Sequence, residues 1–218
     1  WVASRHGNVP WMQFQAVDVV RGGSRGKPFW HAEATGGPLW LQPQVLNRPL
    51  EDGRSSDDKD VRVWSLIDMT AGATGILFTR WRPLLDGPLF GAFGPMAMDG
   101  SVTPQAEMAG KLARWANAHP EIWKSRPVKG DVGIVFVQES ADFASIQGSG
   151  GGGRGGGAAG GEGGGNNYLQ SAQGAYQAFF DSNIQADFVS IDDLGEYPLV
   201  YLPYPEMLRK SSADKLRD

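Results

Sequence analysis

Short apolar runs alternate with segments of helical periodicity along this chain, and this alternation restricts the possible folds more than any other feature. Apolar runs over 28–33 and 76–81 flank a segment of helical spacing over 61–71. A strand, a helix and a second strand in this order are typical of a βαβ unit with two parallel strands. The mostly continuous apolar character of both runs predicts strands that are buried on both faces.

Three helices are predicted in the first half of the chain. Residues 11–20 form the first, which Arg21-Gly-Gly would close, and Asp57 or Asp58 is a suitable N-cap for the second over 61–71. Between the first strand and the second helix, 36–60 reads as a long loop that contains prolines. The third helix covers 104–118, and the predicted core-facing residues of the last two helices are Val61, Trp64, Ile67, Met69, Met108, Leu112, Trp115 and Ala116.

The chain changes character after Trp123, which is the last of its eight tryptophans. A clear strand over 131–137 starts a new alternation of strands and helices, typical of a doubly wound α/β domain. Its further elements are a helix over 168–181, strands over 186–190 and 197–203, and a helix from about 207 to the end. The sequence therefore predicts a first domain over 1–120, a connector over 121–130 and a second domain over 131–218.

A glycine-rich tract interrupts the second domain, with 13 glycines among the 18 residues of 148–165. Such a composition cannot bury apolar surface, which predicts a flexible loop. A phosphate-binding loop is the alternative, because backbone amides of glycine loops can surround anions. The tract lacks the Gly-x-x-x-x-Gly-Lys-Ser/Thr pattern that this function requires, so the flexible loop is the preferred interpretation.

Composition excludes several classes of protein. The formal net charge of −4 and the scattered lysines and arginines argue against a nucleic-acid partner. No apolar stretch has the length needed to span a bilayer, so no membrane partner is expected. The start at Trp1 has no basic flank and no apolar core of a signal peptide, and it resembles the middle of a longer polypeptide. These features leave the compartment open, with a slight preference for the cytoplasm.

Metal, thiol and serine-nucleophile chemistry have no support in the sequence. There is no cysteine, which excludes disulfides, thiolate metal sites and a cysteine nucleophile. The histidines, His6, His31 and His119, are far apart and form no metal-binding pair, so neither a metal nor a cofactor is expected. No Gly-x-Ser-x-Gly motif is present. On a regular strand His31 would share a face with Glu33, but a packed, hydrogen-bonded histidine is the preferred interpretation.

Carboxylate chemistry remains. Glu33 closes the run Lys27-Pro-Phe-Trp-His-Ala-Glu33, and Trp40 follows after a glycine-proline turn. A carboxylate at the end of a strand, close to an aromatic ring, suits glycoside cleavage, because the ring stacks on the apolar face of a sugar. The alternative is an exposed glutamate that happens to end a strand.

The second strand also ends in polar and aromatic residues, Arg80-Trp81-Arg82. Because the carboxyl ends of barrel strands gather on one face, this segment is expected beside Glu33. The arginines would keep Glu33 ionised and bind sugar hydroxyls, and Trp40 or Trp81 would form the floor of the pocket. Alternatively, the arginines are solvated or pair with a loop acid such as Asp86.

These motifs, taken in order over residues 11–118, resemble glycoside hydrolase family 42, the retaining β-galactosidases. The matching segments are the Glu33 strand, Trp40, Arg62-Val-Trp64, Gly72-Ala-Thr-Gly-Ile-Leu-Phe and Arg80-Trp-Arg82. The resemblance implies a TIM (β/α)8 barrel, with Glu33 as the catalytic nucleophile at the end of the seventh strand. The strand before Arg80 would then be the eighth, and the substrate a small carbohydrate.

The second half of the chain resembles the start of the domain that follows the barrel in this family. That domain has an amidotransferase-like, flavodoxin-like α/β fold and mediates trimer formation, so a homotrimer is expected. The resemblance implies no amidotransferase triad there, and the chain has no cysteine to supply one.

Two departures from the family pattern qualify these expectations. The acid/base glutamate precedes the nucleophile by several strands in the family, and a full barrel needs roughly 250 residues, so this chain alone should be catalytically incomplete. The loop after Arg82 has Gly87-Pro-Leu-Phe90-Gly where many members carry a glutamate and a histidine that bind galactose hydroxyls. A noncatalytic sugar-binding or assembly module is the alternative function.

Overall fold

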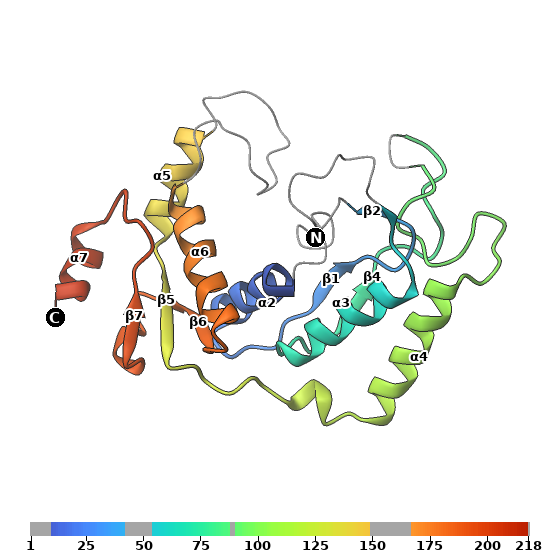
Figure 1. The fold of residues 1–218 in the computed structure, drawn as a ribbon, viewed down its shortest axis with the longest axis horizontal. Coiled ribbons are helices and arrows are strands. Elements are labelled where there is room, and N and C mark those ends of the chain that lie inside the picture. Colours follow the sequence, from blue (N-terminus) through green and yellow to red (C-terminus); the bar gives the residue numbers. More distant parts are fainter. Residues whose placement is uncertain (1–9, 42–53, 88–89, 149–166, 218) are drawn as a thin grey trace. The chain divides into compact units, whose positions relative to one another are not determined.

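The computed structural model describes residues 10–41, 54–87, 90–148 and 167–217, which form two compact units (Figure 1). In its described residues, unit 1 comprises 10–17 and 27–127, and unit 2 comprises 18–26 and 128–217. None of the helices in the described ranges is long and apolar enough to cross a bilayer.

Unit 1 contains the predicted βαβ arrangement. Strand β1 (His31–Ala34) pairs in parallel with β4 (Ile76–Phe78), and helix α3 (Asp58–Thr70) connects them. Two further short strands, β2 (Trp40–Leu41) and β3 (Arg54–Ser55), pair antiparallel. The prediction of parallel strands is confirmed, whereas the prediction of an unstructured loop over 36–60 is wrong at β2 and β3; positions 42–53 of that loop lie outside the described residues.

The strands of unit 1 are shorter and more exposed than predicted. Trp30 is 64% exposed and precedes β1, and Trp81 is 72% exposed and follows β4. In β4, Leu77 is 54% exposed, whereas Phe78 lines a cavity with residues of helices α2 (Pro10–Ser24) and α3. The helices therefore cover only one face of the pair. Hydrophobic periodicity could not reveal this, because apolar runs look alike whether one or both faces are covered.

Helix α3 has the predicted N-cap and core face. Asp57 accepts hydrogen bonds from the amides of Lys59 and Asp60, and the Asp60 carboxylate accepts one from the amide of Asp57, which completes a capping box. The cap places the start of the helix at Asp58, before the first residue of the apolar pattern. The predicted core residues Val61, Trp64, Ile67 and Met69 are all buried.

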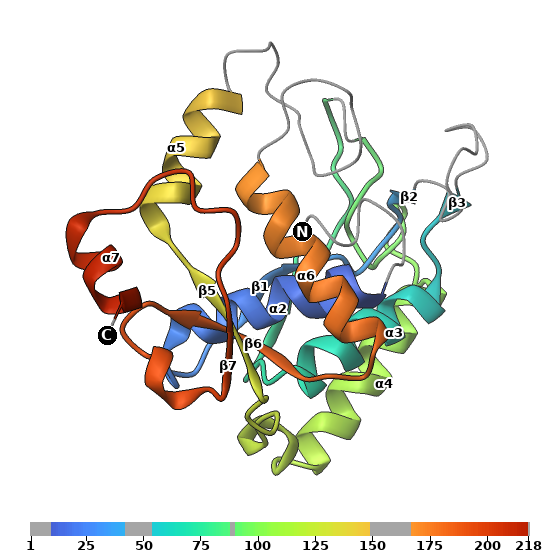
Figure 2. The same cartoon turned by 60° about the vertical axis from the view of Figure 1, so that its left-hand side comes forward.

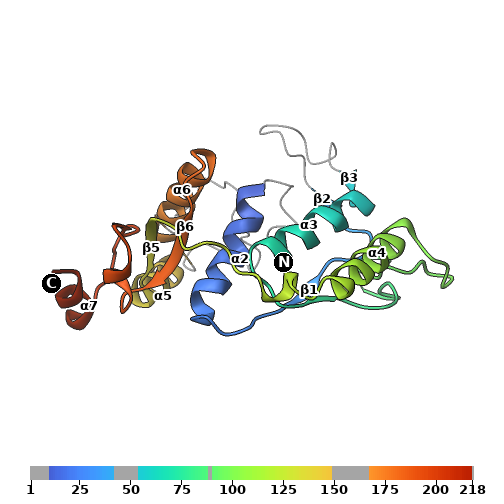
Figure 3. The same ribbon diagram turned by 90° about the horizontal axis from the view of Figure 1, so that it is seen from below.

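Helix α4 covers Pro104–Ala118 as predicted and packs beside α3, as Figure 3 shows. Its N-cap is Thr103, whose hydroxyl accepts a hydrogen bond from the amide of Ala106. Leu112 and Ala116 are buried, but Trp115 is 43% exposed, so its predicted place in the core is wrong. A 3₁₀ turn, η2 (Ile122–Lys124), follows in the connector.

Unit 2 is an α/β unit, and the three strands in its described residues are all parallel (Figure 2). β5 (Val132–Phe136) lies between β6 (Ala186–Ser190) and β7 (Leu199–Tyr201), so the chain crosses over the central strand to reach β7. A buried cluster of Val135, Val137, Ala144, Tyr168 and Val189 forms its core. The helices are α5 (Gln138–Gly148), which the sequence did not predict, α6 (Asn167–Asp181) and α7 (Lys210–Arg217), with a 3₁₀ turn η3 (Leu194–Glu196). The glycine-rich tract lies outside the described residues from 149 to 166.

Helix α2 (Pro10–Ser24) continues through Gly22 and Gly23, so the predicted glycine stop is wrong. A Cβ on Gly22 would lie 2.1 Å from the carbonyl oxygen of Phe188, which shows that this glycine permits a close approach to β6. Arg21 adds ion pairs to Asp18 and Asp187. The chain reverses instead at Arg25 and Gly26, whose φ angles are 48° and 79°.

Candidate active site

Glu33 lies on a β-bulge near the carboxyl end of β1. The amide of His31 donates to the carbonyl of Gly75 at 3.0 Å, and the amide of Thr79 donates to the carbonyl of Ala34 at 2.9 Å. Between the register pairs His31–Ile76 and Ala34–Phe78, β1 has one residue more than β4, so the register shifts. Ala32 and Glu33 are consequently both exposed, instead of alternating. Bulges re-aim side chains and are frequent beside active sites.

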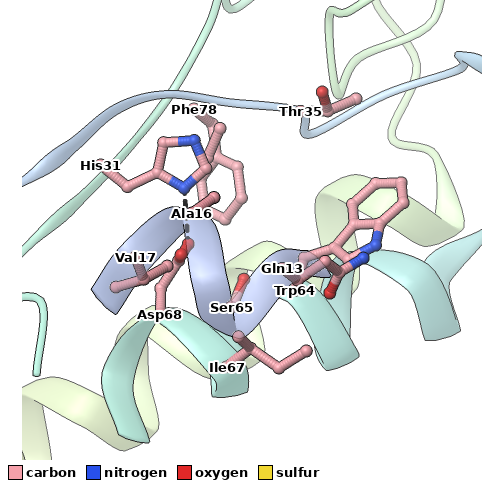
Figure 4. A pocket seen from close by; sticks show the side chains of 11 residues that line it. Gln13, Ala16, Val17, His31, Thr35, Trp64, Ser65, Ile67, Asp68 and Phe78 are labelled. Carbon is pink, nitrogen blue, oxygen red and sulfur yellow. Dashed lines mark hydrogen bonds and ion pairs between the residues drawn. The ribbon is translucent and has the colours of Figure 1, made fainter. Parts of the chain in front are cut away.

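His31 is a packed, hydrogen-bonded histidine, as predicted. Its Nδ1 lies 2.7 Å from Oδ2 of Asp68 in α3 (Figure 4), and Asp68 is buried. The imidazole therefore points toward α3, and the bulge removes the two-residue alternation that would have placed it on the same face as Glu33. His31 anchors β1 to the helix layer.

A cavity of about 50 Å³ lies behind β1, on the side of the helices (Figure 4). His31, Asp68, Trp64 and Gln13 contribute to its lining. The side-chain amide of Gln13 is buried and has no hydrogen-bond partner among the described residues. This space suits water rather than a sugar ring, so it is not a substrate pocket.

The loop that follows β1 is closely packed against the loop that follows β4. A Cβ on Gly37 would lie 1.9 Å from the carbonyl oxygen of Gly94, and the amide of Phe93 donates to the carbonyl of Pro38 at 3.1 Å. Leu39 and Phe93 join one buried cluster with Trp64. The backbone of the next residue, Trp40, is held in β2 opposite Ser55.

Arg80, Trp81 and Arg82 follow β4 and are all exposed. The parallel register brings their segment to the same edge as Glu33, as predicted. Within the described ranges neither arginine forms an ion pair with Glu33, so the predicted contact that would keep Glu33 ionised is absent from this structure. Arg80 has a φ of 72°, a left-handed conformation that non-glycine residues seldom adopt outside functional or tightly constrained positions.

Phe90 is exposed on the loop after Arg82. Its amide donates to the carbonyl of Gly87 at 3.1 Å, and the amide of Gly91 donates to the carbonyl of Leu84 at 2.8 Å. Phe90 is 63% exposed, and positions 88 and 89 lie outside the described residues. The side chains described in this turn therefore offer an aromatic ring but no hydrogen-bonding group.

Sequence reasoning missed three polar residues around this edge: Gln13, Ser56 and Asp68. Each is buried, and Gln13 and Asp68 line the cavity behind β1. Only Asp68 had a usable signal, because it lies four residues after Trp64 and therefore shares the buried face of α3. No group of three or more histidine, aspartate or glutamate side chains in the described ranges could hold a metal ion.

No protein-family model and no curated protein sequence matches the chain. Solved structures do match over nearly its whole length. The chain folds like part of a β-galactosidase.

The β-galactosidase of Bacillus circulans sp. alkalophilus superposes with a TM-score of 0.71 at 20% identity, covering 94% of this chain and 28% of that one. That of the haloarchaeon Halorubrum lacusprofundi gives a TM-score of 0.67 at 22% identity, over 96% and 28%. Gan42B, a family-42 β-galactosidase from G. stearothermophilus, gives 0.67 at 17% identity, over 94% and 27%. The chain thus spans less than a third of the length of these β-galactosidases.

Unit 2 contains a separate buried polar network at the C-terminal half of α2. The carboxylate of Asp18 accepts hydrogen bonds from Tyr176 and Arg21, and Arg21 also pairs with Asp187 at 2.8 Å. Burial raises the pKa of Asp18 above its usual value, against the opposing effect of Arg21. Burial, helped by Asp187, also raises the pKa of Tyr197 to about 12. These groups satisfy one another, which indicates a structural role.

Unit 2 also has a cavity of about 410 Å³ at the carboxyl ends of β5 and β6. The charged side chains that line it already have partners. The Arg25 guanidinium donates a hydrogen bond to the hydroxyl of Ser190 at 2.8 Å, and the Glu139 carboxylate accepts one from the hydroxyl of Ser212 at 2.7 Å. A hydrogen bond from the amide of Arg209 and one from the hydroxyl of Ser212 lower the pKa of Glu139. The bonds of Glu139 fasten α7 to the start of α5.

Proposed function

We propose that this chain is the C-terminal part of the catalytic (β/α)8 barrel of a retaining β-glycosidase, followed by the start of an assembly domain. The substrate would be a terminal β-galactoside or a related β-glycoside. The observation that carries the proposal is the exposed Glu33 on a bulge at the carboxyl end of a parallel strand pair. The likeness of the fold to β-galactosidases supports it.

In this mechanism Glu33 is the nucleophile. Its carboxylate attacks the anomeric carbon, and the bond to the leaving oxygen breaks while a glutamate outside this chain protonates that oxygen. The same glutamate then removes a proton from water, which attacks the glycosyl-enzyme and releases Glu33. Two inversions retain the configuration of the sugar.

The neighbouring residues would bind the sugar. Trp40 and Trp81 would offer ring faces to its apolar side, and Arg80 would donate hydrogen bonds to its hydroxyls. The high exposure of Trp81 and the left-handed backbone of Arg80 support these roles. By the family resemblance, the loop that contains Phe90 corresponds to one where many members carry side chains that hydrogen-bond galactose hydroxyls. Phe90 cannot form such a bond with an axial hydroxyl, so we expect this loop to discriminate only weakly between galactose and glucose.

Replacing Glu33 by glutamine in the complete protein tests the nucleophile. We expect turnover of a nitrophenyl β-galactoside to fall by roughly a thousand-fold or more, because an amide cannot form the covalent intermediate. Glu107→Gln is the matched control, since Glu107 is also an exposed glutamate, on α4, and should tolerate the change. Substantial activity in the Glu33→Gln variant would contradict the assignment of Glu33 as the nucleophile.

Rescue by azide tests directly whether Glu33 is the nucleophile. A Glu33→Ala variant supplied with azide should form a glycosyl azide of inverted configuration, because the small anion replaces the carboxylate and leaves only one displacement. Nuclear magnetic resonance of the product reads the configuration. If the complete protein binds galactose by calorimetry but never turns over a galactoside, it is a sugar-binding or assembly module instead.

The complete protein is also proposed to be a homotrimer, on the family resemblance of residues 130–218. Sedimentation equilibrium of the complete protein measures this, and a monomeric mass would contradict it.

A further inference from the structure

Ser56 holds three backbone groups of the loop that follows Glu33. It is 3% exposed and lies between β3 and the N-cap of α3. Its hydroxyl donates to the carbonyl of Gly37 at 2.9 Å and accepts from the amide of Leu39 at 3.0 Å. Its own amide donates to the carbonyl of Leu39 at 2.8 Å. One side chain and one amide therefore clamp a short piece of backbone.

Ser56 is itself fixed from two sides. The side-chain amide of Gln105, in the first turn of α4, donates to the carbonyl of Ser56 at 3.1 Å. On the other side, Asp57 is the N-cap of α3, and Asp60 of the same capping box binds Arg54 at 2.7 Å. The clamp is thus mounted on two helices rather than on a free loop, which favours a precise position.

The clamped segment has little other freedom. Gly37 lies too close to Gly94 for any side chain, and the amide of Phe93 holds the carbonyl of Pro38. This segment connects β1, which carries Glu33, to β2, which begins at Trp40. The backbone path from Glu33 to the start of β2 therefore runs through residues 37–39.

Glu33 itself is held by different bonds. The hydrogen bonds of His31 with Gly75 and of Thr79 with Ala34 bracket the bulge, and neither involves Ser56. Loss of the Ser56 hydroxyl should therefore loosen the path to Trp40 while leaving the backbone around Glu33 in place.

We propose that Ser56 is a positioning residue for substrate binding: its hydroxyl sets the backbone path of residues 37–39, which leads from the Glu33 strand to the start of β2 at Trp40. This inference rests on the proposed glycosidase function. The proposal gives Ser56 a role in substrate binding, through Trp40, and no role in the chemical step at Glu33.

Ser56→Ala in the complete protein tests the proposal, with Ser65→Ala as the matched control. Ser65 is equally buried, but its hydroxyl donates to the carbonyl of Val61 within α3. We expect KM to rise roughly three- to thirty-fold in Ser56→Ala, as for the loss of one or two buried hydrogen bonds, with kcat within about three-fold. The control should change neither constant. An unchanged KM in Ser56→Ala, or an equal effect of both variants, would overturn the proposal.

Hydrogen exchange of the Leu39 amide gives a readout that does not depend on activity. The Ser56→Ala variant should exchange this amide faster than the wild type and the Ser65→Ala variant, because its acceptor is gone. Unchanged protection contradicts the clamp. If the complete wild-type protein shows no glycosidase activity, the proposed function fails while the exchange result still decides whether the clamp exists.

A milder variant covers the case in which Ser56→Ala does not fold. Gln105→Ala removes only the outer support of Ser56 from a half-buried position. A rise in KM of roughly two- to five-fold is expected, smaller because the hydroxyl contacts remain. No change in KM together with unchanged exchange at Leu39 would count against the proposal.

Discussion

At the scale of single residues, polar side chains in apolar surroundings determine the local architecture. His31 and Asp68 join β1 to α3, Ser56 clamps the loop after β1, and Asp18 lies in the polar network of unit 2. Buried polar groups need partners, and each of these has them at hydrogen-bond distance. A short linear motif does not reveal such partners, because they lie far apart in the sequence.

Asp18 carries a prediction about pH. Its pKa is raised in the folded state by burial, so the folded protein binds its proton more tightly than the unfolded chain does. Its contribution to stability is therefore fully present below the unfolded pKa, at about 3.9, and is lost as the pH rises through the folded pKa. The unfolding free energy of the wild type minus that of Asp18→Asn should decrease from pH 3 to pH 7.

Asp192→Asn provides a control of opposite sign in the same unit. Hydrogen bonding to Lys215 lowers the pKa of Asp192, so its contribution is present above the unfolded pKa and is lost as the pH falls. Denaturant titrations of the wild type, Asp18→Asn and Asp192→Asn at several pH values measure how each difference in unfolding free energy changes with pH. A flat or rising difference for Asp18→Asn would show that burial does not dominate its pKa.

At the scale of elements, local rules located most helices and strands, and tertiary contacts decided where they end. Pro104 and Thr103 set the start of α4, and Asp57 sets that of α3, because caps satisfy backbone amides within a few residues. The end of α2 escaped prediction, because Gly22 serves a close approach to β6 rather than a helix stop. The bulge at Glu33 likewise depends on the partner strand.

The two adjacent glycines of α2 allow a matched test. Gly22→Ala should destabilise unit 2 by about 1–3 kcal/mol, because the new methyl group would overlap the carbonyl of Phe188. Gly23→Ala meets no atom within 4 Å and should stabilise the helix by about 0.5–1 kcal/mol. Thermal or urea unfolding monitored by circular dichroism measures both. Equal effects would contradict the proposed role of Gly22.

At the scale of the whole molecule, the described surface of unit 1 includes an uncovered strand face with Leu77 and Glu33 exposed. In the proposed barrel this face would form the interior, completed by strands from the rest of the polypeptide. This chain covers only 28% of the length of the matching β-galactosidases, which agrees with that arrangement.

Catalysis should therefore require more than these 218 residues. A preparation of this chain alone should not hydrolyse a nitrophenyl β-galactoside measurably, whereas the complete protein should, because the proposed mechanism needs a second carboxyl group that it assigns to the rest of the polypeptide. Release of nitrophenol measures both, and circular dichroism confirms that the shorter preparation is folded. Comparable rates would show that the acid/base group lies within these residues.

The sequence by itself determined the order of the main helices and strands, the N-cap of α3, the range of α4, the parallel βαβ unit and Glu33 as a candidate nucleophile, since periodicity, capping and strand-end position act over short stretches of chain. Only the tertiary structure decided which strand face is covered, that Glu33 lies on a bulge, that His31 pairs with Asp68, and that Ser56 holds the loop after β1. Each of these depends on atoms brought together from distant positions, and hydrogen bonds and close packing act only at contact distance.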